Sequence, residues 1–137
     1  MNDPKRATEI FLCEKLSAAV PGHQFVPFHG GGTNVDPSEM EPPFTVVMLD
    51  DAERTHSTEG TWICNGNIQT ITHSKETSIQ THSELSRAIY AALDSIPPSY
   101  TADFAFHGID INKVSTSEEE SLQCRANIVG FTCGVGS

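Results

Sequence analysis

An apolar stripe in the second half of the chain constrains its fold more than any other feature. The stripe recurs at helical spacing, in steps of three and four residues, and consists of Leu85, Ala88, Ile89, Ala92, Leu93 and Ile96. This pattern predicts an amphipathic helix with one buried face. Two capping boxes compete for its start, Thr77–Gln80 and Thr81–Glu84, and Pro97-Pro98 ends it. The rest of the chain must supply a layer for this face to cover.

The N-terminal half predicts a second helix and a buried strand. Asp3-Pro4 suits a helix start, because Asp caps free N–H groups and Pro already has the φ of the first turn. A stripe containing Leu12 and Leu16 follows, and Pro21-Gly22 ends the helix. A short strand is expected at Gln24–Phe28. The most apolar run of the chain, Phe44–Leu49, predicts a central strand that ends abruptly at the charged residues Asp50, Asp51, Glu53 and Arg54.

A hairpin is predicted around Asn65-Gly66. Both residue types tolerate positive φ, so a type I′ turn can join the flanking strands Thr61–Cys64 and Asn67–Thr72. In the last third of the chain, Phe104 and Phe106 alternate in one parity and Ile109 and Ile111 in the other. This change of parity predicts a bulge at Gly108.

The final strand is expected after an acidic turn at Ser117–Glu120. Its apolar residues begin in one parity and then switch to the other: Leu122, Cys124, Ala126 and Ile128, followed by Val129, Phe131 and Cys133. Strands with one buried and one wet face are typical of antiparallel sheets. The order of elements predicts an α+β fold, a mostly antiparallel sheet with two main helices packed on one face, in a single domain spanning residues 1–137.

The net charge of −10, with only eight Lys and Arg, limits the possible partners. Specific binding to DNA or RNA needs a basic stripe to displace counterions from phosphates, and the scattered basic residues form none. Attraction to anionic membranes is disfavoured for the same reason. No apolar run reaches membrane-span length, and no secretory signal is evident, so we expect synthesis in the cytoplasm.

Catalytic and metal-binding motifs are missing from the sequence. The six histidines never stand at zinc-site spacing, no Ser lies in GxSxG, and the Asp50–Glu53 acids do not follow an EF-hand pattern. We therefore expect no catalytic residue, no metal and no cofactor. In a chain without an export signal, Cys13, Cys64, Cys124 and Cys133 are interpreted as free thiols in the core rather than as disulfides.

The segment His29–Pro43 has no hydrophobic periodicity and begins with Gly30, Gly31 and Gly32. A phosphate-binding role is disfavoured, because the P-loop lysine is missing and no helical pattern follows. Loops of this length in compact domains usually have a function or are disordered. We interpret it as a long flexible loop hinged at the glycines.

The chain resembles the tail-terminator (tail-completion, minor tail) proteins of long-tailed phages and prophages. The likeness covers most of the chain at the level of pattern. It rests on Pro43–Leu49, Ile68–His73, the helix Ser78–Leu93 with the form S-x3-H-x2-L-x3-I-x3-L, and the closing stretches Phe106–Ile111 and Leu122–Phe131. Its motifs are loose, and the loop His29–Pro43 departs from the family pattern.

The resemblance implies a virion protein that forms a ring, usually hexameric, on the completed tail tube at the head–tail junction. Its partners would be further copies of itself, the tail-tube protein and a head-completion or connector protein. DNA would pass through the ring without specific binding, repelled by an acidic lumen. The candidate interface and lumen residues lie in two segments: Gly30, Gly31, Gly32, Glu39 and Glu41 in the first, and Asp50, Asp51, Glu53 and Arg54 in the second.

Two other classes of function stay open at this point. One is a bacterial small-molecule-binding or regulatory α+β domain, with the loop His29–Pro43 as its lid. The other is a hydrolase or metal enzyme, for which no residue of the sequence provides an anchor.

Overall fold

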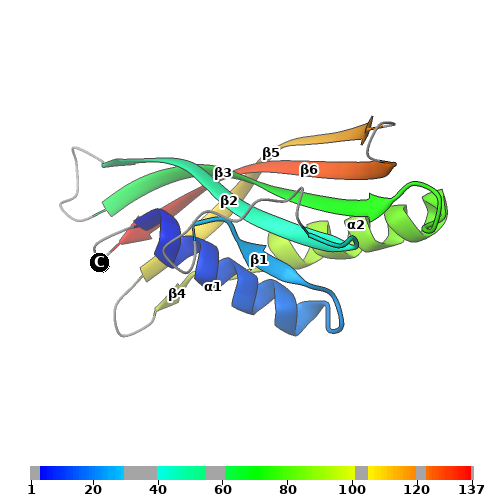
Figure 1. Ribbon diagram of the computed structural model, residues 1–137. Helices are drawn as coiled ribbons and strands as arrows, with labels where there is room; N and C mark the ends of the chain where they lie inside the picture. Colours follow the sequence, from blue (N-terminus) through cyan, green and yellow to red (C-terminus); the bar gives the residue numbers. More distant parts are fainter. Residues whose placement is uncertain (1–3, 30–39, 55–60, 101–104, 120–122, 137) are drawn as a thin grey trace.

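The computed structural model describes residues 4–29, 40–54, 61–100, 105–119 and 123–136. It shows the α+β fold that the sequence predicts, with helices on one side of a largely antiparallel sheet (Figure 1). The elements are α1 (Pro4–Ala19), β1 (Phe25–Pro27), β2 (Phe44–Arg54), β3 (Thr61–His73), α2 (Ile79–Asp94), β4 (Ser99–Tyr100), β5 (Ala105–Glu119) and β6 (Cys124–Gly136).

The sheet has six strands in the order β1-β2-β3-β6-β5-β4. All neighbours are antiparallel except β1 and β2. The two edge strands are short: β1 pairs only with Thr45–Val47 of β2, and β4 only with Ala105 and Phe106 of β5. Four long central strands therefore form the body of the molecule.

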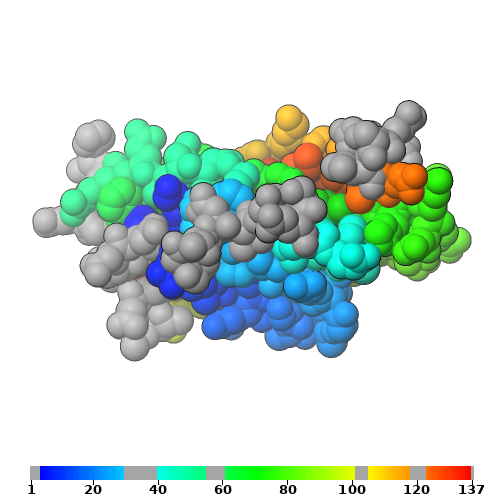
Figure 2. All heavy atoms as spheres, in the orientation of Figure 1, coloured from blue at the N-terminus to red at the C-terminus, as the bar shows by residue number. Residues whose placement is uncertain are grey.

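Both helices pack on the same face of the sheet, which we call the inner face. In the space-filling view, α1 (blue) lies along the lower side of the molecule beneath β2 (cyan) (Figure 2). The inner side chains of the central strands are buried against the helices, including Val47, Leu49, Ile68, Val129 and Phe131. The helices contribute Phe11, Leu12, Leu16, Ile89 and Leu93 to the core, and Ile96 joins them just after the end of α2.

Both predicted helices are present, and their ends lie close to the predicted ones. The second helix starts at neither capping box: Ser78 is the N-cap, and its hydroxyl accepts a hydrogen bond from the Thr81 backbone N–H at 3.1 Å. The helix stops at Asp94, before Pro97. The bulge predicted at Gly108 is also present, because the pairing of β5 with β6 shifts between Phe106 and Ile109 and Gly108 has φ +116°.

The predicted hairpin at Asn65-Gly66 is wrong. Both residues lie inside β3, which runs without interruption between β2 and β6. The glycine is needed for close approach rather than for a turn: a Cβ at Gly66 would lie 2.5 Å from the Met48 carbonyl oxygen. The true hairpin joins β2 to β3, so that Arg54 pairs with Trp62.

The predicted end of the central strand at Leu49 is also wrong. β2 continues through the charged residues to Arg54, across a register shift between Leu49 and Asp51. Asp50 is the extra residue of this bulge, which lets the acids continue β2 instead of opening a loop.

The predicted change of parity in the last strand does not occur. β6 pairs with β3 residue for residue, and its odd-numbered side chains, from Asn127 to Val135, are buried throughout. Cys124, Ala126 and Ile128 are half-buried on the opposite face. Alternation alone could not assign the faces, because apolar residues occupy both of them.

Candidate assembly surface

The face of the sheet opposite the helices, the outer face, carries a row of hydrogen-bonded polar side chains across four strands. Asn65 Nδ2 donates to Asp51 Oδ1 at 2.9 Å, and Thr132 Oγ1 donates to Asn65 Oδ1 at 2.8 Å. Asn112 Nδ2 in turn donates to Thr132 Oγ1 at 3.1 Å. The row therefore links β2, β3, β6 and β5, although its members are far apart in the chain.

A second, shorter row runs beside it. Asn67 Nδ2 donates to Asp50 Oδ2 at 3.2 Å, and Gln69 Nε2 donates to Asn67 Oδ1 at 3.0 Å. The exposed charges Glu53, Asp110 and Lys113 belong to the same face, by their pairing with Ile63, Thr132 and Gly130. We call these ten residues the polar outer face: Asp50, Asp51, Glu53, Asn65, Asn67, Gln69, Asp110, Asn112, Lys113 and Thr132.

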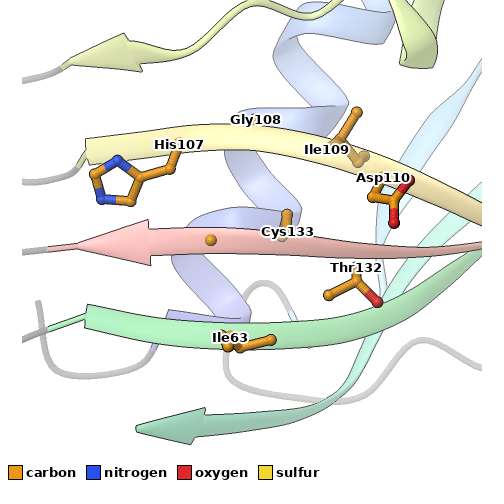
Figure 3. A pocket seen from close by; sticks show the side chains of 8 residues that line it. Ile63, His107, Gly108, Ile109, Asp110, Thr132 and Cys133 are labelled. Atoms are coloured by element: carbon orange, nitrogen blue, oxygen red, sulfur yellow. The ribbon is translucent and has the colours of Figure 1, made fainter. Parts of the chain in front are cut away.

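A hollow of about 360 Å³ adjoins the polar outer face where β3, β6 and β5 lie side by side (Figure 3). Gly108 and Gly134 leave its floor without side chains, and His107, Asp110, Thr132 and Ile63 stand around it, with α1 behind the strands. Ile63 is 45% exposed. The hollow is open and shallow, with no converging set of catalytic groups among its lining residues.

A second hollow, of about 290 Å³, lies on the inner face between α2 and the far ends of β5 and β6. It exposes apolar side chains from both sides: Tyr90 is 38% exposed and Val114 is 54% exposed. The hydroxyl of Ser86 is buried here with no hydrogen-bond partner among the described residues. α2 therefore does not fully cover β5 on the inner face around Val114.

A buried carboxylate, that of Glu9, connects α1 to β2 just before the acids of the polar outer face. Glu9 is fully buried, and its Oε2 accepts from the Leu49 N–H at 2.9 Å and contacts His29 Nδ1 at 2.6 Å. Its Oε1 accepts from the His29 N–H at 2.6 Å. Because β1 ends before Leu49, the carboxylate takes the place of a strand partner there and fixes the point where the free edge of β2 begins.

The structure brings together some of the site residues predicted from the sequence. Asp50, Asp51 and Glu53 share the polar outer face, whereas Arg54 lies on the other side of β2, with its guanidinium 6.0 Å from the Trp62 ring centroid. Glu41 is exposed, with Oε1 3.7 Å from His73 Nε2. Gly30, Gly31, Gly32 and Glu39 lie outside the described residues, together with most of the predicted loop.

Most of the cysteines and one histidine are buried within the fold. Cys13, Cys64 and Cys133 are buried, and Cys124 is half-buried. Burial and the nearby Glu9 raise the pKa of the Cys13 thiol to about 12, so this thiol is unreactive at neutral pH. His82 is buried and contacts Thr72 Oγ1 through Nδ1 at 2.7 Å. Among the described residues, no group of three or more His, Cys, Asp or Glu side chains is arranged to hold a metal ion.

Sequence reasoning missed the buried carboxylate of Glu9 and the row of amides on the outer face. Glu9 was hidden within a helical pattern, although a carboxylate inside an apolar stripe is itself a signal. The amides Asn65, Asn67 and Asn112 have no signal of their own, because their alignment depends on the register of four strands.

The fold is similar to that of a chain in the virion of a native gene transfer agent particle. The two superpose with a TM-score of 0.63 over 97% of this chain and 92% of the other, at 14% sequence identity. No protein-family model matches the sequence, and neither does any curated protein. None of the described helices is long and apolar enough to cross a membrane. The likeness establishes a shared fold.

Proposed function

We propose that this protein is a structural subunit of a phage-like particle. Copies of it would close into a ring, hexameric in our proposal, that caps the tail tube at the head–tail junction, as the resemblance to tail terminators implies. The fold supports this proposal, since it is shared over nearly the full length of both chains with a component of a gene transfer agent virion. The ring-forming role rests on the surfaces described above.

The observation that carries the proposal is the contrast between the two faces of one sheet. The helices cover the inner face, and the opposite face presents exposed acids and amides held in hydrogen-bonded rows. In the proposed ring, the polar outer face of each sheet would turn toward the central hole. The hole would then be lined by four acids of each copy, Asp50, Asp51, Glu53 and Asp110, and by one basic residue of this face, Lys113. Such a wall repels phosphate groups, so DNA slides through without sticking.

The proposed partners follow from that arrangement. Other copies of the chain would meet along the sides of the ring, the tail-tube protein on one rim and a head-completion or connector protein on the other. No cofactor or catalytic group is part of the proposal. The net charge of −10 makes the copies repel one another, so ring closure should be favoured by divalent cations.

The test is the assembly state, measured by light scattering and negative-stain microscopy over a range of protein and Mg²⁺ concentrations. We expect closed rings of about six subunits with a central hole, because one heterologous interface repeats until it closes. Image averages should place the helices on the outside and the sheet around the hole. A protein that stays monomeric and also fails to bind purified tail tubes would contradict the proposal, as would rings whose helices line the hole.

A further inference from the structure

Two long stretches of strand edge have no strand partner among the described residues. β1 covers only the first part of β2, and Glu9 occupies the edge N–H of Leu49, so the free edge of β2 starts at Asp50. β4 covers only the start of β5, which leaves β5 unpaired on that side from Ile109 onward. Exposed edges of this length readily pair with another chain.

The register identifies which backbone groups point outward. Thr45 N–H donates to Gln24 and Val47 C=O accepts from Phe28, so Val46 faces β3 and pairs there with Gln69. In an antiparallel sheet, successive residues direct their backbone N–H and C=O groups to opposite neighbours. Followed across β3 and β6, this rule makes Ile68 and Val129 a hydrogen-bonded pair, and likewise Ile128 and Ser115.

It follows that Val114 and Thr116 on β5 direct their N–H and C=O groups to the free edge. On β2, beyond the bulge, Ala52 and Arg54 do the same, because Asp51 and Glu53 face β3. Each edge therefore offers alternate backbone donors and acceptors that have no strand partner within the described part of the chain.

We propose that the free edge of β5 in one copy pairs with the free edge of β2 in the next, with Val114 opposite Ala52. The pairing is antiparallel, because β2 and β5 run antiparallel within one sheet and a ring keeps every copy in the same orientation. This interface rests on the proposed ring and identifies how its subunits meet.

Side-chain chemistry selects this register. Val114 opposite Ala52 places Lys113 opposite Glu53 and Ser115 opposite Asp51, all on the outer face, where opposite charges and a hydroxyl–carboxylate pair are favourable. It also brings the exposed Val114 against the apolar Ala52.

The two neighbouring registers are less favourable. Asn112 is an extra residue in β5, since the pairing with β6 shifts between Ile111 and Lys113. With this bulge counted, a shift of two residues in one direction puts Lys113 opposite Asp51 but also Asp110 opposite Glu53, which places like charges across the interface. A shift in the other direction puts Val114 opposite Arg54 and leaves Lys113 with no carboxylate opposite it.

Mixtures of variants of the full chain, each with one cysteine introduced beside the four native ones, test the pairing. Ser115→Cys and Asp51→Cys, purified separately, are mixed and exposed to oxidised glutathione. The two positions form a non-hydrogen-bonded pair, in which Cβ atoms are close enough for a disulfide. The control mixture is Ser117→Cys with Asp51→Cys, which exposes a thiol on the same face of β5 but one pair out of register.

We expect the first mixture to give a covalent heterodimer about tenfold above the control mixture, since disulfide formation is steeply geometry-dependent. Equal yields in both mixtures, or no heterodimer at the highest soluble protein concentration, would overturn the pairing. Closed rings seen by microscopy without this cross-link would refute the interface and leave the ring intact. Cross-linked open chains that never close would support the interface and refute the ring.

Discussion

The two faces of the central sheet differ although the same four strands build both. On the inner face, Phe131, Ile68 and Leu49 are at most 1% exposed and pack beneath the helices. On the outer face, the same strands present Asp51, Asn65 and their neighbours in exposed hydrogen-bonded rows. The inner face stabilises the monomer. Apart from Phe44 and Val46, which are buried near the start of β2, the outer face leaves groups available to solvent and to other molecules. Stability and assembly should therefore respond to different substitutions in the same strands.

The largest effect is expected from truncating an inner side chain. Phe131→Ala should lower the free energy of unfolding by about 3–5 kcal/mol, because it removes buried apolar surface and leaves a cavity. The matched change on the outer face, Ile63→Ala, should cost less than about 1 kcal/mol, since this side chain is 45% exposed. Urea unfolding of both variants measures the difference, and equal costs would contradict the assignment of faces.

A smaller loss is expected at the buried carboxylate that joins helix and sheet edge. Glu9→Gln replaces an acceptor with an amide donor facing the N–H groups of His29 and Leu49, and should cost about 3 kcal/mol. Glu14→Gln, an exposed position on the same helix, should stay within about 0.5 kcal/mol of the parent. A neutral Glu9→Gln variant in thermal unfolding would show that the edge of β2 does not depend on this contact.

Proline scanning separates the free edge of β5 from its paired side. Ser115 donates its N–H within the sheet, so Ser115→Pro should cost about 2 kcal/mol or more through the lost bond and a buried unpaired carbonyl. Val114→Pro removes only an N–H that points to the free edge, and should cost less than about 1 kcal/mol while abolishing assembly. Circular dichroism melts and light scattering give the two readouts. The reverse order of stability would show that the outward direction of Val114 is wrong.

The smallest effect is a pH dependence of stability. Burial, together with the positive charge of Arg125, lowers the pKa of His82 from its ordinary value of 6.5. The unfolded chain therefore binds a proton more readily than the folded one, and stability should fall as the pH drops below about 6.5. The melting temperature should decrease by a few degrees from neutral pH to pH 5, less so in His82→Gln. His23, whose pKa burial also lowers, should account for part of the remaining slope.

The sequence predicts the inner face of the sheet and its helices better than the outer face. The helical stripe from Leu85 to Ile96 and the apolar run Phe44–Leu49 identify the layers correctly, because burial leaves a periodic signal. Asn65-Gly66 is a dipeptide typical of a turn, and it led to the wrong hairpin prediction. Here the glycine is needed because the backbone of β2 passes too close to Gly66 for a Cβ atom. In β6, half-buried Ala126 and Ile128 on the outer face imitate a core pattern.

The candidate surface was only partly predictable. The acids at Asp50, Asp51 and Glu53 stand out by charge, and the structure brings these three together on one face. Their amide neighbours come from β3, β6 and β5, so their alignment depends on long-range register that no local pattern records. The free edges of β2 and β5 depend likewise on where β1 and β4 stop.

The most direct test of the account is to reverse the charge of the outer face beside the β2 edge. The Asp51→Lys, Glu53→Lys double variant should keep the parent melting temperature within a few degrees and show no assembled species by light scattering, under conditions where the parent forms rings. Assembly equal to that of the parent would contradict the role of this surface. A large loss of melting temperature would contradict the separation of the two faces.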